Sequence, residues 1–410
     1  MSRPHIFVFA DYYLPGYKAG GPIASLSNIV KLLGDEFEFF IFTRDRDAGE
    51  NQPYSEVKCS EWVRVGKAKV LYSTDLSLRF IRRRLIEISP NVIYLNSFFS
   101  ALSVKALLLR RLGLLPPVEI VLAPRGEFSL GALELKSIRK WCYRKAASLF
   151  GTSSGVIWHA SSELEREQIE RALQKDRTKR CCIEIATDLP DIDILYSGAH
   201  AEKPEKLPGA AKFLFLSRIS PMKNLTFALD MLGRINGQLE LDIYGPADDK
   251  AHWEKCQRRI QAVPGNVTVR YHGAVPSSQA VQLAALYHFF ILPSQGESFG
   301  HAILEALAAG CPVILSDRTP WRDVLEAGAG WCLSLEAAEE WRAVMQSCAD
   351  MNAEIYRTHS LQARRYFESW CRQTVESNNT AKLFHFALSR AASVSVPLDK
   401  SVSAASSARV

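Results

Sequence analysis

Two glutamates stand eight residues apart in a stretch that could hold both a phosphate and the hydroxyl groups of one ligand. Glu297 lies in a loop of small residues, and Glu305 lies about one turn into the helix predicted over 302–309. An apolar run over 289–293 predicts a strand before the loop. A helix that begins after such a loop presents free backbone N–H groups and the positive end of its dipole, which suit a phosphate. The residues therefore predict a site for a sugar nucleotide.

Two cations follow another predicted strand, about 80 residues upstream. Arg218 comes directly after the apolar run 213–216, and Lys223 opens the next helical pattern. At a strand–loop–helix junction, two cations five residues apart can hold a diphosphate between them. Taken alone, Lys223 would be explained as a solvated residue in the first turn of a helix. Beside the two glutamates, the phosphate role is favoured.

Three motifs together resemble one protein family. Segment 297–305 resembles the E-x7-E motif of retaining glycosyltransferases with the GT-B fold, most closely those of family 4. Segment 213–225 resembles the strand–Arg–loop–Lys–Asn–Leu segment of that family, and 13–22 resembles its glycine loop after the first strand. The motifs occur in the family's order over roughly residues 5–330. The resemblance implies an α/β protein in which two doubly wound, Rossmann-like domains face each other across a cleft.

The resemblance also implies a role for each motif residue. Arg218 and Lys223 would neutralise the leaving diphosphate without a metal ion, and Glu297 would bind hydroxyl groups of the transferred sugar. The other residues implied in donor binding belong to the glycine loop, the turn before the helix and the helix itself: Gly20, Gly21, Ser298, Phe299, Gly300 and Glu305. No cofactor is implied, since the nucleotide-diphosphate sugar is a co-substrate. Two Asp-x-Asp patterns, 45–47 and 191–193, match a metal motif in letters only.

The acceptor side is predicted from strand ends of the first half of the chain. The family often has a histidine after a later strand here, whereas this chain has Pro-Arg-Gly-Glu at 124–127, as in a subgroup involved in bacterial polysaccharide assembly. Asn96, Arg125 and Glu127 would point into the cleft and bind a hydroxyl or a phosphate of the acceptor. The alternative for the last two is an internal ion pair that fixes the loop. His159 is interpreted as a buried structural histidine.

The length of 410 residues suggests two domains, and strand and helix patterns alternate through both halves. The predicted units are an acceptor-binding domain over 1–195, a linker over 196–210, a nucleotide-sugar-binding domain over 211–352, a helix over 353–390 and a disordered tail over 391–410. The helical pattern runs unbroken from 353 to 389. The resemblance implies that this last helix crosses back to the first domain.

Charge and cysteine content bear on compartment and partners. The net charge is +6, and residues 62–145 hold 16 Lys and Arg against 5 Asp and Glu. Such a surface would suit anionic lipid headgroups, although segment 136–145 is explained equally well as a solvated helix face. Nucleic-acid binding is disfavoured because no binding motif accompanies the charge. Nine scattered cysteines, no signal-like segment and no long apolar run predict a cytoplasmic enzyme, with peripheral contact to the inner membrane face as an extension.

The predicted function is therefore retaining transfer of a sugar from a nucleotide-diphosphate sugar to an acceptor hydroxyl. The resemblance implies a glycan or lipid-linked acceptor, in exopolysaccharide, O-antigen or lipopolysaccharide assembly. The alternatives are a GT-B-fold sugar-nucleotide epimerase or phosphorylase, and a non-catalytic relative that binds lipid. The intact motif residues Arg218, Lys223 and Glu297 argue against loss of catalysis.

Overall fold

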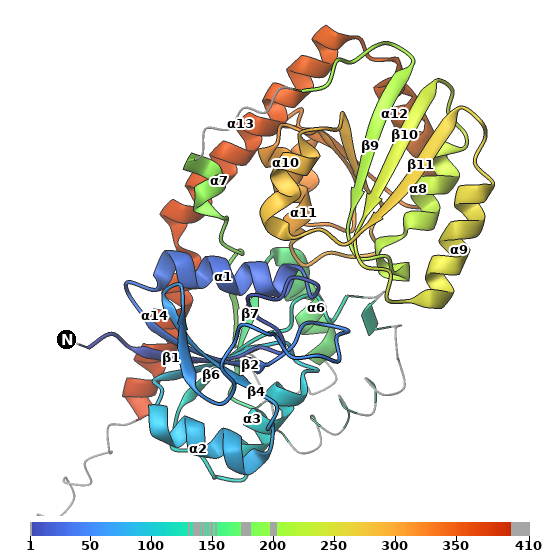
Figure 1. Cartoon of the computed structure of the whole chain (residues 1–410). Coiled ribbons are helices and arrows are strands. Elements are labelled where there is room, and N and C mark those ends of the chain that lie inside the picture. The colour runs from blue at the N-terminus through green and yellow to red at the C-terminus, as the bar shows by residue number, and fades with distance from the viewer. Residues whose placement is uncertain are drawn as a thin grey trace, which may run out of the picture.

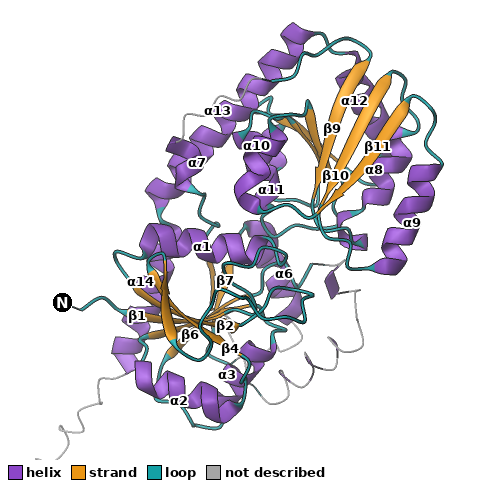
Figure 2. Cartoon of the chain, in the orientation of Figure 1, coloured by secondary structure: helices purple, strands orange, loops and turns teal. Residues whose placement is uncertain are grey.

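The chain folds into two α/β units, one built on a mostly parallel sheet and one on a fully parallel sheet (Figure 1). The computed structural model describes residues 2–129, 132–133, 141, 143, 145, 147, 151, 154–173, 182–196 and 203–394. Helices cover the faces of both sheets (Figure 2), so the strands are apolar along most of their length. The predicted fold class of two doubly wound units is confirmed.

The first sheet has the strand order β3-β4-β2-β1-β5-β6-β7-β8. Its strands are β1 (His5–Phe9), β2 (Glu38–Arg44), β3 (Trp62–Val65), β4 (Ala68–Ser73), β5 (Val92–Asn96), β6 (Glu119–Ala123), β7 (Ile157–Ala160) and β8 (Cys182–Ile185). Its helices are α1 (Gly21–Leu33), α2 (Leu78–Ile88), α3 (Ala101–Arg111), α6 (Glu163–Leu173) and α7 (Ile192–Tyr196). Strand β3 was not predicted. It is a half-exposed edge strand that turns back on β4 through a tight turn at Gly66, where φ is +58°.

The second sheet is parallel throughout, with the order β11-β10-β9-β12-β13-β14. Its strands are β9 (Ala210–Leu216), β10 (Gln238–Tyr244), β11 (Val267–Gly273), β12 (Phe289–Leu292), β13 (Val313–Ser316) and β14 (Gly330–Leu333). Its helices are α8 (Leu225–Leu232), α9 (Lys250–Gln261), α10 (Ala280–Ala284), α11 (His301–Ala308) and α12 (Ala338–Asp350). The last strand and helix, β14 and α12, were not predicted. The strand order reverses between β9 and β12, and ligands of such sheets bind in the crevice at this switch point.

Part of the predicted linker is fixed to the second unit. Lys206 is fully buried, and its ammonium group donates hydrogen bonds to the carbonyl oxygens of Ala349 and Met351, at 2.8 and 2.9 Å. Burial lowers the pKa of this lysine. The described residues 203–209 therefore hold the end of α12 against the start of β9.

The helical pattern over 353–389 is two helices rather than one. Helix α13 (Ala353–Ser377) ends at Asn378, which has a left-handed φ of +43°, and α14 (Asn379–Val394) begins directly after it. Asparagine tolerates this conformation better than most residues, so it can end a helix without a glycine. Helix α14 reaches four residues into the tail predicted from 391, and residues 395–410 lie outside the described part.

The last helix packs on the first unit, although α13 lies along the second (Figure 1). Phe384 in α14 is fully buried against Phe37, Phe39 and Tyr94, with ring centroids 5.4–6.0 Å apart. Its ring joins the same apolar core as strands β1 and β2. The predicted helix over 136–149 lies mostly outside the described residues. Among the helices that the structure describes, none has the length and apolar character needed to cross a bilayer.

Phe384→Ala should destabilise the first unit by about 3–5 kcal/mol, because it leaves a cavity in an aromatic cluster. Phe386→Ala, two residues along the same helix, is a matched control because that ring is 37% exposed. Urea denaturation followed by circular dichroism would measure both. Equal, small shifts in the two midpoints would contradict the packing described for α14.

Candidate functional site

The turn between β12 and α11 is shaped by a glycine. Gly300 has a φ of +91°, which few residues other than glycine adopt, and a Cβ atom there would lie 2.7 Å from Ile303 Cδ1. Helix α11 begins at the next residue, and no side chain caps its first N–H groups. These N–H groups and the helix dipole are therefore available to an anionic ligand.

The two predicted motifs meet at Lys223 and Glu297. The lysine ends the short 3₁₀ turn η1 (Pro221–Lys223) after β9, and its Nζ lies 2.5 Å from Oε1 of the glutamate. Both side chains are largely buried, at 17% and 8% exposure. Lys223 is thus no solvated residue of a helix turn. The pair places one positive and one negative group at the switch point, where the strand ends of β9 and β12 converge.

Arg218, at the end of β9, has no partner of its own among the described residues. The residue follows β9, its side chain is exposed, and it makes no hydrogen bond or ion pair with any residue that the structure describes. Its guanidinium group can therefore bind a phosphate from solvent without breaking an existing interaction.

Glu305 lies inside the first turns of α11 in partly buried surroundings. Its carboxyl group forms no hydrogen bond with the described residues, so its oxygens can accept bonds from ligand hydroxyls. Burial raises the pKa of Glu305 to about 7, an effect that His301 opposes and Asp191 reinforces. Near neutral pH this carboxyl group is present in both protonation states.

The glycine loop of the first unit lies against the start of α11. Gly20 has a φ of +68° and precedes α1, and a Cβ atom on Gly21 would lie 3.3 Å from Cδ2 of His301. Gly21 of the first unit and the first turn of α11, which follows Gly300, therefore lie next to each other. Ser298 and Phe299 belong to the same loop, and Ser161 Oγ donates a hydrogen bond to the Ser298 carbonyl at 3.0 Å.

A second contact between the units is polar and buried. Ser25 Oγ donates a hydrogen bond to Asp188 at 2.6 Å and lies 2.8 Å from Nε2 of His301. Burial alone would raise the pKa of Asp188, but Arg125, together with His301 and Ser25, holds it well below its usual range. This contact was not predicted from the sequence. The one signal for Asp188 is its place shortly after β8, at a strand's carboxyl end.

The predicted acceptor residues are engaged inside the first unit. Arg125 forms an ion pair with Asp188, and its Nε donates a hydrogen bond to Asn96 at 2.8 Å. Glu127 accepts hydrogen bonds from Ser97 Oγ at 2.7 Å and from the backbone N–H of Phe98 at 2.6 Å. Arg125 thus forms an internal ion pair, as in the alternative interpretation, but its partner is Asp188 rather than Glu127.

His159 is buried among the same strand ends. Its Nδ1 lies 2.8 Å from the Tyr94 hydroxyl and its Nε2 lies 2.6 Å from the Ala186 carbonyl, and burial lowers its pKa to about 4. Over the described residues, no group of three or more His, Cys, Asp or Glu side chains is arranged to hold a metal ion. Both aspartates of the 191–193 pattern pair with Lys31 instead.

Comparison with known proteins bears on the second unit first. Residues 198–358 match the family described as glycosyl transferases group 1. One relative, the O-antigen chain mannosyltransferase B of Escherichia coli, is 29% identical over 178 residues. That match covers 42% of this chain and 45% of the relative, so it spans less than half of the relative's length.

Solved structures resemble the whole chain. Sucrose-phosphate synthase from Thermosynechococcus elongatus has a TM-score of 0.67 at 16% identity, covering 94% of this chain and 100% of that one. The Anabaena protein HepE, solved in complex with UDP and glucose, has a TM-score of 0.67 at 15% identity, with the same coverage of 94% and 100%. At these identities the likeness concerns the fold, which is GT-B.

Glu305→Gln should stabilise the protein increasingly as the pH rises. Because the folded pKa of about 7 lies above the ordinary value of 4.5, folding takes up a proton, and stability is lost as the pH rises between these values. The gain in the free energy of unfolding of the variant amounts to up to about 3 kcal/mol at high pH. Melting temperatures from about pH 5 to pH 8 would measure it. Glu340→Gln, at an exposed position, is the control and should show no such trend. If the melting temperature of Glu305→Gln differed from that of the unmodified protein by the same amount at every pH, the raised pKa would be contradicted.

Proposed function

Because residues 198–358 match the glycosyl transferases group 1 family and the whole chain has the GT-B fold, we propose that the protein transfers a sugar from a nucleotide-diphosphate sugar to an acceptor hydroxyl. The observation that carries this proposal is the contact between Lys223 and Glu297 at the switch point of the second sheet, with Arg218 after β9 and Glu305 in α11. The cations and the uncapped helix N-terminus match a diphosphate. The carboxyl group of Glu305, whose oxygens form no hydrogen bond with the described residues, matches a ribose.

The donor would lie between the two units. In this arrangement Arg218 and Lys223 bind the diphosphate from one side, and the N–H groups at Phe299 and Gly300 bind it from another. Glu305 accepts hydrogen bonds from the ribose, and Gly20 with Gly21 closes the space from the first unit. Lys223 already pairs with Glu297, so an incoming phosphate would share the ammonium group with that carboxylate.

We propose that the anomeric configuration is retained and that no metal ion is required. The bond from the anomeric carbon to the phosphate oxygen breaks as the acceptor oxygen bonds to the same face, and the acceptor's hydroxyl proton passes to the leaving phosphate. Arg218 and Lys223 would supply the positive charge that stabilises the departing diphosphate. Glu297 is held in an ion pair with Lys223, which suits binding of sugar hydroxyls better than nucleophilic attack. An inverted product, identified by NMR, would overturn this part.

The partners that we propose are a nucleotide-sugar donor and a glycan or lipid-linked acceptor. The similarity to an O-antigen mannosyltransferase supports a place in bacterial exopolysaccharide, O-antigen or lipopolysaccharide assembly. Retained Arg218, Lys223 and Glu305 favour an enzyme over a non-catalytic lipid-binding relative. Release of nucleotide diphosphate only when an acceptor is present would distinguish transfer from the epimerase alternative, and dependence on a nucleotide rather than on inorganic phosphate would distinguish it from a phosphorylase.

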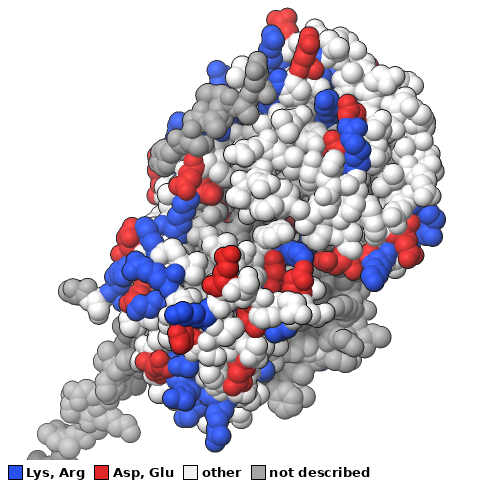
Figure 3. Space-filling model, in the orientation of Figure 1, with Lys and Arg blue, Asp and Glu red and all other residues white. Residues whose placement is uncertain are grey.

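Contact with an anionic membrane is a further part of this proposal. Helix α2 exposes Arg79, Arg82 and Arg83, together with Ile86, which is 48% exposed. Figure 3 shows Lys and Arg side chains over this lower edge of the molecule. Basic residues beside exposed apolar ones favour anionic lipid headgroups. Equal sedimentation with anionic and neutral vesicles would contradict such contact.

Melting temperatures with a panel of nucleotide diphosphates and their sugars, with and without EDTA, test the donor site. One nucleotide class should raise the melting temperature, because it binds only the folded state, and EDTA should leave the rise unchanged. Arg218→Ala should weaken the binding of that nucleotide about tenfold or more, since a charge-assisted hydrogen bond is lost. The exposed Arg258→Ala in α9 is the control. No response to any nucleotide, or an equal response in Arg218→Ala, would overturn the proposal.

A further inference from the structure

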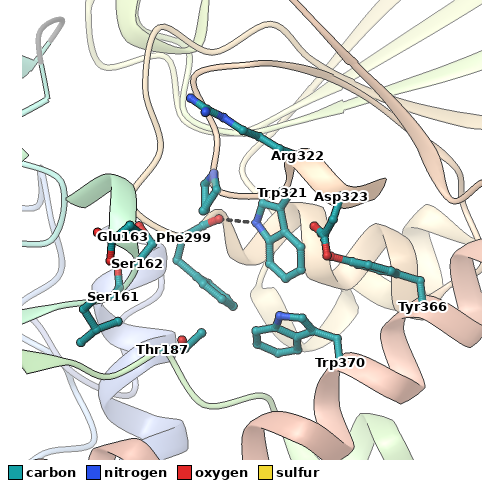
Figure 4. A pocket seen from close by; sticks show the side chains of 12 residues that line it. Ser161, Ser162, Glu163, Thr187, Phe299, Trp321, Arg322, Asp323, Tyr366 and Trp370 are labelled. Carbon is teal, nitrogen blue, oxygen red and sulfur yellow. Dashed lines mark hydrogen bonds between the residues drawn. The ribbon is translucent and has the colours of Figure 1, made fainter. Parts of the chain in front are cut away.

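A cavity of about 540 Å³ lies between the two units, on the β13 side of the loop that holds Glu297. Its walls come from the start of α6, the end of β8, the 299–323 region and α13 (Figure 4). This size falls within the range of small-molecule sites, about 300–1,000 Å³. Arg218 and Lys223 follow β9, on the other side of β12, so the cavity is distinct from the diphosphate position.

One side of the cavity is a wall of aromatic rings. Phe299, Trp321 and Trp370 pack with ring centroids 5.1–5.5 Å apart, and Tyr366 continues the wall at 6.3 Å from Trp321. The Trp321 indole N–H donates to the Phe299 carbonyl oxygen at 2.5 Å, and the Tyr366 hydroxyl donates to Asp323 at 2.7 Å. These bonds fix the rings, so the wall is preformed rather than assembled on binding.

The facing side offers hydroxyl groups from the first unit. Ser161 Oγ lies 2.6 Å from a carboxylate oxygen of Glu165 and 3.0 Å from the Ser298 carbonyl oxygen. Ser162 Oγ lies 3.4 Å from that carbonyl oxygen and accepts a hydrogen bond from the Glu165 N–H. Thr187 Oγ1 and Trp370 Nε1 have no hydrogen-bond partner among the described residues, and both border the cavity (Figure 4). A ligand with several hydroxyl groups would satisfy these donors and acceptors.

We propose that this cavity binds a neutral sugar ring. One face of a pyranose is apolar C–H surface that packs on aromatic rings, while its hydroxyl groups need partners such as Thr187 and Trp370. We assign this ring to the acceptor glycan, and that assignment rests on the proposed function. Phe299 and Glu297 are two residues apart, so their Cα atoms are separated by no more than about 7 Å. The cavity therefore lies within reach of a sugar next to the one being linked.

The charges around the cavity decide against other ligands. The lining carries two carboxylates, Glu163 and Asp323, and one guanidinium, Arg322, while Glu163 is paired with Arg166. These charges leave no positive excess for a phosphate or another anion. A lipid chain would leave the Thr187 hydroxyl and the Trp370 indole N–H without water or a partner, which costs free energy.

Saturation-transfer NMR with neutral monosaccharides and disaccharides, without nucleotide, tests the binding. Glucose, mannose, galactose, rhamnose and N-acetylglucosamine serve as probes, with dissociation constants of about 1–10 mM expected for a fitting sugar. Trp370→Leu should weaken binding about fivefold to tenfold. Thr187→Val, which keeps the shape of the side chain, should weaken it about threefold to tenfold. Exposed Thr268→Val in β11 is the control and should leave binding unchanged.

Three outcomes would each overturn the sugar site. These are no saturable binding, binding by both cavity variants as tight as by the unmodified protein, and tighter binding of glucose 1-phosphate than of glucose. Because no nucleotide is present, these outcomes are separate from failure of the donor site. The acceptor role is read from kinetics once an oligosaccharide acceptor is in hand. Trp370→Leu should raise the acceptor KM while the donor KM stays unchanged, and an unchanged acceptor KM would overturn that role alone.

Discussion

The buried carboxylate of Asp188 is the charge around which the cleft is organised. Arg125 pairs with it from the loop after β6, Ser25 from α1 and His301 from the other unit. A buried charge that loses its partners is strongly unfavourable, so these elements must keep their relative positions. The glycine loop before α1 and the first turn of α11 are thereby set opposite each other. The proposed donor site lies between these two elements, so its shape would depend on this interaction.

The chemical character of the site follows from how charges are paired before any ligand arrives. Lys223 and Glu297 neutralise each other, Arg218 is unpaired among the described residues, and Glu305 sits near its point of half-protonation. The proposed diphosphate would thus meet Arg218 and a second cation, Lys223, that Glu297 already orients. Such preorganisation reduces the cost of arranging charges when the leaving group departs.

Much of this arrangement follows from the order of residues, because parallel strands bring their carboxyl ends to one edge. That rule accounts for the contact between Lys223 and Glu297, which 74 residues separate, although their motifs were assigned to one predicted site through the family resemblance. Partners that depend on tertiary packing were out of reach: nothing in the sequence links Arg125 to Asp188 rather than to Glu127. Strand β3 and the break at Asn378 were missed for a local reason, since a half-exposed edge strand and a left-handed asparagine leave the apolar periodicity almost unchanged.

The position of α14 gives the two units an order of completion during synthesis. The first sheet is made early, but the helix that carries Phe384 into its core follows the whole second unit in the chain. At about 5–20 residues per second, the roughly 200 intervening residues take about 10–40 s to emerge from a ribosome. During that interval the aromatic surface of Phe37 and Phe39 lacks its cover. The second unit, whose elements are contiguous, can close first, and the nascent first unit is the one that needs protection from aggregation.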